Sequence, residues 1–179
     1  EHPLQRLMAD TLADLAGEPV AATAVDGCGA PVMAISLAGL ARSFGRIASA
    51  EPGTPEHEVT VAMRAHPEYG GGTRRDVTAL IRGTEGLIGK DGAEAVHAVG
   101  LVDGRGVALK IADGTQRARP VVLAAVLLWL VGPASYWLEL LVGLAELGFD
   151  AFVFWPMEPS AEETERFAHE VAPALRARV

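Results

Sequence analysis

The only cysteine of this 179-residue chain, Cys28, lies in the glycine-rich segment "VDGCGAPV", two residues after Asp26. An ordinary thiol is only slightly ionised at neutral pH, so a nucleophilic role needs an activating neighbour, and no such signature is local. The flanking glycines let the backbone approach a ligand, whereas cysteines elsewhere are commonly packed thiols. The residues alone therefore leave a packed thiol and a ligand position open, and one cysteine falls short of the three protein ligands that a zinc site needs.

A lysine and an arginine–aspartate pair are the other candidates for chemistry. Lys90 in "GKDGAEAV" is expected at the edge of a sheet, where partial burial could fit it for proton transfer; the alternative is a solvated strand-end lysine. Asp91 beside it could pair with Lys90 and leave it a poor base. Arg75 and Asp76 in "GGTRRDVT" could shape a substrate pocket, or could be a surface loop with a helix cap.

Local patterns predict the elements that would hold these residues. Apolar spacing and capping residues predict four helices. The first covers residues 2–16 with Gly17 as its C-cap, and the second begins after Ser36. The third runs from Pro55 to about residue 66, and the fourth covers residues 77–83 with Asp76 as its cap. A short strand is expected before the cysteine turn, and a loop over "PEYGGGTRRD". Between residues 86 and 114, three short apolar runs divided by glycine turns predict a small antiparallel sheet. The fold class is therefore predicted as α+β, an antiparallel sheet flanked by helices, with an appended α/β tail.

The tail contains the longest apolar run, 11 residues from Val121 to Val131. A bilayer needs about 18 to 20 residues, so two buried helices around the Gly132–Pro133 break are expected and a membrane span is not. A buried strand in "DAFVFWP" and a last helix capped by Ser160 and Glu163 should follow.

Composition narrows the classes of partner. The formal net charge of −8 removes the attraction to phosphates that drives nucleic-acid binding, so no nucleic-acid partner is expected. A single cysteine excludes an internal disulfide, and the N-terminus lacks a signal-peptide pattern, which predicts a cytoplasmic setting. The first residue is Glu1, so the chain is expected to be trimmed or to be a segment of something longer.

Five segments in one order resemble the asparaginase II family, the serine/lysine, zinc-associated L-asparaginases: "HPLQ", "VDGCGAPV" with "LAGLAR", "AMRAHPEYGGGTRRDVTALIR", "GKDGAEAVHAVGL" and "GVALKIADGTQRAR". That family is similar in fold to serine β-lactamases and glutaminases and hydrolyses L-asparagine to L-aspartate and ammonia. The resemblance implies that Lys90 is catalytic, that Asp26, Arg75 and Asp76 bind substrate, and that Cys28 is a zinc ligand. Asp91 stands where a small or hydroxyl residue is usual, and Ala95 where the family has glycine.

The resemblance also implies an incomplete site. The family's Ser-x-x-Lys and Cys-x-Gly-Lys-His elements precede the matching part, so residues 1–125 are expected to be a C-terminal half-domain that is inactive alone. It could form a homodimer or dock with the missing N-terminal half.

Residues 126–179 resemble the C-terminal end of luciferase-like flavin-dependent oxidoreductases, which are TIM barrels. One barrel strand cannot form a flavin site, so no flavin is expected. The two resemblances meet between about Arg119 and Gly132, and a gene fusion, a rearranged gene or a designed chain would each give this junction. The alternatives are a fragment of a flavin-dependent monooxygenase, or a non-enzymatic complementing or binding module.

Overall fold

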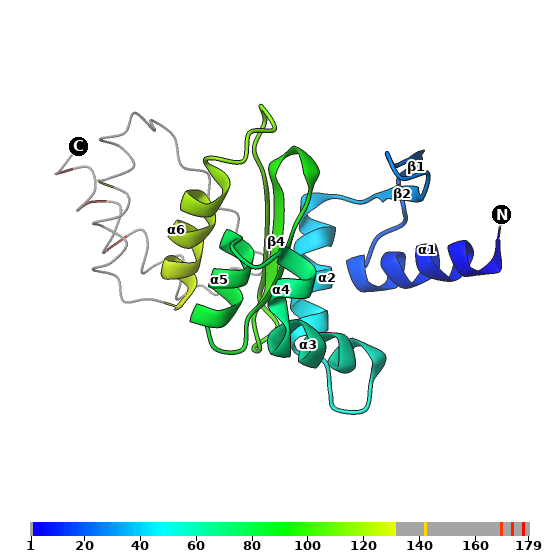
Figure 1. Ribbon diagram of the computed structural model, residues 1–179, viewed down its shortest axis with the longest axis horizontal. Coiled ribbons are helices and arrows are strands. Elements are labelled where there is room, and N and C mark those ends of the chain that lie inside the picture. The colour runs from blue at the N-terminus through cyan, green and yellow to red at the C-terminus, as the bar shows by residue number, and fades with distance from the viewer. Residues whose placement is uncertain (1, 132–141, 143–168, 170–172, 174–176, 178–179) are drawn as a thin grey trace. The chain divides into compact units, whose positions relative to one another are not determined.

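The computed structural model describes residues 2–131 together with 142, 169, 173 and 177. The chain divides into two compact units, Glu1–Arg119 and Pro120–Val179. The first unit contains all strands of the described residues (Figure 1).

The first unit begins with helix α1 (Pro3–Ala16) and a hairpin formed by β1 (Ala22–Val25) and β2 (Pro31–Ala34). Gly17 adopts φ 63°, the left-handed conformation that glycine takes without steric cost, and it ends the helix as its C-cap. The two strands are antiparallel, with Val25 opposite Pro31 across the turn that carries Cys28. Both strands are largely exposed, so the hairpin lies outside the core.

Helix α2 (Leu37–Ala48) is the central helix of this unit. The Ser36 hydroxyl accepts a hydrogen bond from the Gly39 backbone N–H at 2.9 Å and caps the helix, as the sequence predicts. Its buried face consists of small residues: Gly39, Ala41, Ser43, Gly45 and Ala48. Small residues allow a close approach to the neighbouring sheet.

The core sheet has three antiparallel strands in the order β3 (Ile88–Asp91), β4 (Val96–Gly100) and β5 (Gly106–Lys110). α2 packs on one face of this sheet so closely that a Cβ on Gly100 would collide with the carbonyl oxygen of Phe44. Side chains alternate between the two faces of a strand, so His97 and Val99 point away from α2. Asp91 lies directly opposite His97 and shares its face.

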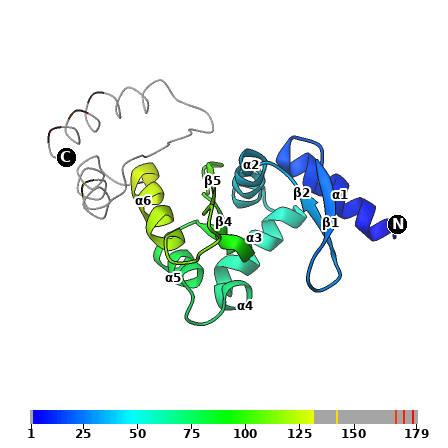
Figure 2. The same ribbon diagram turned by 90° about the horizontal axis from the view of Figure 1, so that it is seen from above.

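The face that carries His97 is covered by helix α5 (Asp76–Gly83), which follows α3 (Pro55–Ala65) and α4 (Pro67–Gly71). A Cβ placed on Gly89 of β3 would lie 3.6 Å from a methyl group of Val77 on α5, which is fully buried. Figure 2 shows α2 and α5 on opposite sides of the sheet. The predicted α+β fold, a sheet flanked by helices, is confirmed.

Three local predictions need correction. Residues 67–71 form a helical turn where a loop was expected. Pro67 starts the turn, and the Gly72 N–H donates to the Glu68 carbonyl. Of the three glycines, only Gly72 has a positive φ, 93°. Asp76 does not cap α5: it is the first residue of that helix, after Arg75, and its carboxylate is bonded elsewhere. Lys90 lies within β3 and does not begin it.

The connection between β3 and β4 is a tight turn through the short 3-10 segment η1 (Ala93–Ala95). Glu94 and Ala95 have φ values of 56° and 54°, and they are the only non-glycine residues with positive φ in the described part of the chain. A side chain costs about 1–2 kcal/mol per residue in this left-handed conformation, a cost that a glycine at either position would avoid.

Helix α6 (Arg119–Val131) begins at the last residue of the first unit and continues in the second. No helix of the described residues is both long and apolar enough to cross a bilayer. The predicted helix break, second helix, strand and capped last helix lie outside the described residues.

Candidate functional site

The turn between β1 and β2 holds Asp26 and Cys28 at the surface. The Asp26 N–H bonds the Ala30 carbonyl at 2.8 Å, and Gly29 takes a φ of 84°, which closes the turn. The Cys28 thiol donates a hydrogen bond to Oδ2 of Asp26 at 3.1 Å. That bond, followed by one from the Gly27 N–H, lowers the pKa of Asp26 below its ordinary value. Cys28 is exposed, so the packed-thiol alternative does not hold in this structure.

The second group of candidates gathers around one carboxylate, that of Asp91, whose side chain is only 8% exposed. Lys90 donates from Nζ to the Asp91 carbonyl and to Oδ1 at 3.1 Å, as the sequence suggested for this pair. Oδ2 accepts a hydrogen bond from Arg75 and another from Arg119, the latter at 3.1 Å. Burial alone would raise the pKa of Asp91, but the bonds from Lys90 and Arg75 and the charge of Arg119 outweigh it and lower the pKa to about 2.

Arg119 joins this carboxylate to a second one. Its side chain is 2% exposed, and Nη2 donates to both oxygens of Asp76 at 2.8 Å while Nη1 reaches Asp91. A guanidinium suits this task because its planar fork bonds two acceptors at once. We call Arg75, Asp76, Lys90, Asp91 and Arg119 the Asp91 cluster; it connects β3, the start of α5 and the start of α6.

His97 lies directly behind this cluster, opposite Asp91 across the β3–β4 pair. It is 1% exposed, and neither ring nitrogen has a hydrogen-bond partner among the described residues. Burial, and next the positive charge of Arg119, lower the pKa of His97 to about 4. The imidazole is therefore neutral at pH 7 and lies on the face of the sheet that α5 covers.

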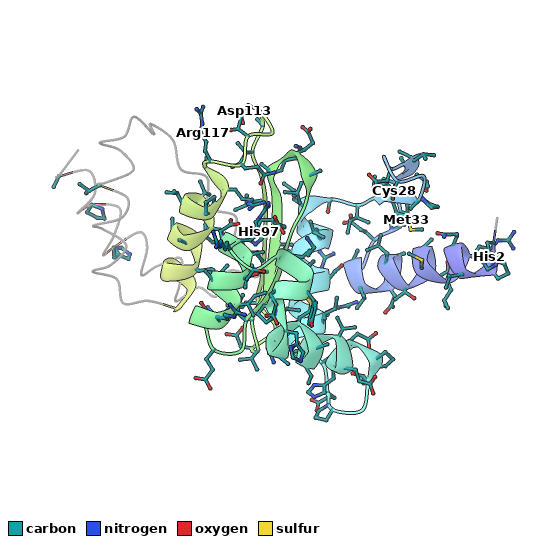
Figure 3. All side chains as sticks on the ribbon, in the orientation of Figure 1. His2, Cys28, Met33, His97, Asp113 and Arg117 are labelled. Carbon is teal, nitrogen blue, oxygen red and sulfur yellow. The ribbon has the colours of Figure 1, made fainter. Side chains whose placement is uncertain are left out.

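The structure brings together Arg75, Asp76 and Lys90, but it does not bring Asp26 and Cys28 to them. Helix α2 lies between the hairpin and the core sheet in both views (Figures 1 and 2). Figure 3 shows Cys28 and Met33 in the hairpin, well apart from His97 on the central strand. The candidates thus form two separate groups within the first unit.

Metal binding is tested by the donor groups that converge. Among the described residues, no three His, Cys, Asp or Glu side chains come together. Cys28 and Asp26 are at most two donors, and one is already hydrogen-bonded to the other. The described residues therefore do not form a zinc site by themselves.

Sequence reasoning missed Arg119, which holds the cluster together. The one local signal was "RARP", where an arginine precedes a proline that can start a helix. Nothing in that pattern says that the arginine points inward, because its partners are 28 and 43 residues away.

The cluster presents two half-exposed cations, Lys90 at 48% and Arg75 at 51%, which share one buried carboxylate. Such a pair can bind a carboxylate or stabilise a developing negative charge, because its own counter-charge is fixed behind it. An ammonium paired with a carboxylate is, in contrast, a poor base.

Comparison with known families identifies one family for this chain. The sequence profile of the L-asparaginase II family matches residues 1–138, which include every described helix and strand. The match places the chain among hydrolases of the asparaginase class. The chain belongs to the asparaginase II family. The match continues past residue 125, which is the boundary expected from the sequence for the asparaginase-like part. A comparison with individually curated proteins gave no match.

Proposed function

We propose that this chain supplies the lysine-bearing side of an L-asparaginase site, which hydrolyses L-asparagine with water to L-aspartate and ammonia. The observation that carries the proposal is the cationic pair of Lys90 and Arg75 on one shared carboxylate, in a chain of the asparaginase II family. L-Asparagine carries an α-carboxylate, and its hydrolysis develops negative charge on the amide oxygen. Both charges are complementary to this pair.

The roles follow from exposure and partners. Lys90 is the catalytic ammonium, which acts through its charge because Asp91 holds it. Arg75 binds the substrate carboxylate from the rim of the cluster. Both carboxylate oxygens of Asp76 accept hydrogen bonds from Arg119. Asp76 therefore supports the site and does not bind substrate in this proposal, although the sequence suggested substrate contact.

The nucleophile must come from elsewhere. The 179 residues contain five serines and two lysines, and none of them forms a Ser-x-x-Lys element. We propose that a segment carrying this element docks on the first unit and that the 179 residues alone do not turn over asparagine. Leu4, Leu7 and Met8 support docking, because they are about half exposed and share one face of α1 through their i, i+3, i+4 spacing. Asp26 and Cys28 lie in the hairpin, apart from the Asp91 cluster, so a zinc site at Cys28 would need further ligands from the docked segment. A cytoplasmic setting fits the single thiol.

Ammonia release tests the proposal. The chain is assayed alone and after co-expression with the N-terminal half of an asparaginase II family protein that contains Ser-x-x-Lys. We expect release only from the co-expressed pair, and a loss of about 100-fold or more in kcat in K90Q. Lys110 is the matched control, because it is the only other lysine and bonds the Glu94 carbonyl away from the cluster.

Turnover by the chain alone would remove the need for a docked nucleophile. Full activity in K90Q would remove the role of Lys90. A tightly docked pair that releases no ammonia would overturn the proposed function itself.

A further inference from the structure

We infer that Arg119 is a positioning residue that fixes the Lys90 ammonium on the edge of the sheet, acting through Asp91. This inference deepens the proposed function, on which its catalytic meaning rests. It is not carried by the family resemblance, because Asp91 departs from the residue type that is usual at this position. The structure of the cluster itself carries it.

The first step is that Lys90 has no other anchor among the described residues. Its ammonium donates to the Asp91 carbonyl and to Oδ1 of Asp91. A lysine side chain has about 2 kcal/mol of rotamer entropy, so an ammonium that is half exposed stays in one place only if its acceptor is rigid. The position of Nζ therefore depends on what holds the Asp91 carboxylate.

The second step is that Arg119 is the better holder of that carboxylate. Arg75 also bonds Oδ2, but its side chain is half exposed and water competes with its contact. Arg119 is 2% exposed and is tied at its other end by two bonds to Asp76 at 2.8 Å. A guanidinium held between two carboxylates in the interior cannot rotate without leaving charges unpaired.

The third step is that the bridge crosses elements. Asp76 is the first residue of α5, Asp91 the last of β3, and Arg119 the last of the first unit. Arg119 therefore links the position of the α5 N-terminus to that of the sheet edge. Arg75, immediately before α5, is set by the same link. One buried guanidinium places both exposed cations.

The test uses the full chain with ¹⁵N-labelled lysine, because two lysines give only two side-chain ammonium signals. In the wild-type chain at low temperature we expect a hydrogen-bonded Lys90 NH₃⁺ signal, assigned by its loss in K90R. R119Q should abolish this signal and leave that of Lys110 in place. R119K, which adds a third lysine signal, should not restore it, because an ammonium lacks the planar fork that bonds Asp91 through Nη1 and Asp76 through Nη2.

Two further variants keep the inference falsifiable. R82Q is the matched control: Arg82 is also on α5, but its ion pair at 2.8 Å is with Glu68, so the Lys90 signal should stay. D76N leaves one acceptor oxygen at position 76 for Arg119 and should weaken the Lys90 signal. It provides a second measurement if R119Q does not fold. A Lys90 signal unchanged in folded R119Q or in D76N would overturn the inference, since a merely structural arginine would change stability alone.

Titration with L-aspartate separates this inference from the proposed function. Loss of the Lys90 signal in R119Q, with no L-aspartate binding by the wild-type chain, supports the positioning role and counts against the proposed substrate. Weaker L-aspartate binding in R119Q than in R82Q supports both. Where the wild-type chain does bind L-aspartate, equal binding in R119Q and R82Q overturns the claim that Arg119 places the cations.

Discussion

Protonation of His97 should control how the stability of this protein changes with pH. The residue is 1% exposed, and burial together with the charge of Arg119 lowers its pKa from 6.5 to about 4. In the unfolded chain the imidazole binds a proton as the pH falls through 6.5, whereas in the folded chain it does so only near pH 4. Between these values the unfolded state binds more protons, so the folded state loses stability as the pH falls.

The magnitude follows from the width of this window. A difference of about 2.5 pH units at about 1.36 kcal/mol per unit gives a loss of about 3 kcal/mol in the free energy of unfolding between pH 7 and pH 4. The charged groups that set the window are Asp91 on β3, Asp76 on α5, Lys90 and Arg119. Asp91 adds its own loss only below pH 3.8, as the pH falls towards 2, so the two contributions separate.

The assay is urea unfolding at pH steps from 7 to 4.5, followed by circular dichroism. Tryptophan fluorescence is unsuitable for the first unit, because Trp129, Trp137 and Trp155 all lie in residues 120–179. H97L removes the titrating group at similar volume, and its unfolding free energy should lose most of its dependence on pH in this range. H66Q, which removes an exposed histidine at the end of α3, should keep the wild-type slope. A flat wild-type profile, or an equal slope in H97L, would refute the reasoning.

Other substitutions test the packing, the cluster and the caps by urea unfolding at pH 7. G100A should destabilise the fold by about 1–3 kcal/mol, because the new Cβ would collide with the Phe44 carbonyl. G27A, in the open turn, should change stability by less than about 0.5 kcal/mol. Equal effects of the two substitutions would contradict the close approach of α2. D91N should cost about 3 kcal/mol, because it removes the buried negative charge that Lys90, Arg75 and Arg119 share. The difference from wild type should shrink as the pH falls from 3.8 towards 2, and a difference independent of pH would exclude the ion pairs as its source. S36A should cost about 1 kcal/mol through loss of the α2 cap, and a neutral result would remove that cap from the determinants of the fold.

Local signals in the sequence predict most of the first unit. The left-handed Gly17, the cap at Ser36 and Pro55 at the start of α3 each depend on residues within about one turn. The three strands follow from glycine-divided apolar runs, since a hairpin is also a local structure. The exception is α4, where three glycines suggested a loop but only one of them has a positive φ.

The site was less predictable, because it depends on contacts between distant residues. The pairing of Lys90 with Asp91 was visible, as the two residues are adjacent. The inward position of Arg119 was not, because its partners belong to other elements. Nor did the sequence show that α2 lies between the hairpin and the core sheet, because motif order says nothing about which side of a helix a turn occupies.

The strained turn between β3 and β4 has a consequence for the register of the sheet. Two consecutive residues, Glu94 and Ala95, hold left-handed backbone conformations there, and the turn fixes Asp91 opposite His97. A slip of one residue in this pairing would invert the orientation of every side chain on the slipped strand. Asp91 would then face α2, away from both arginines. A short loop that contributes no side chain to the Asp91 cluster thus determines on which face of the sheet this cluster forms.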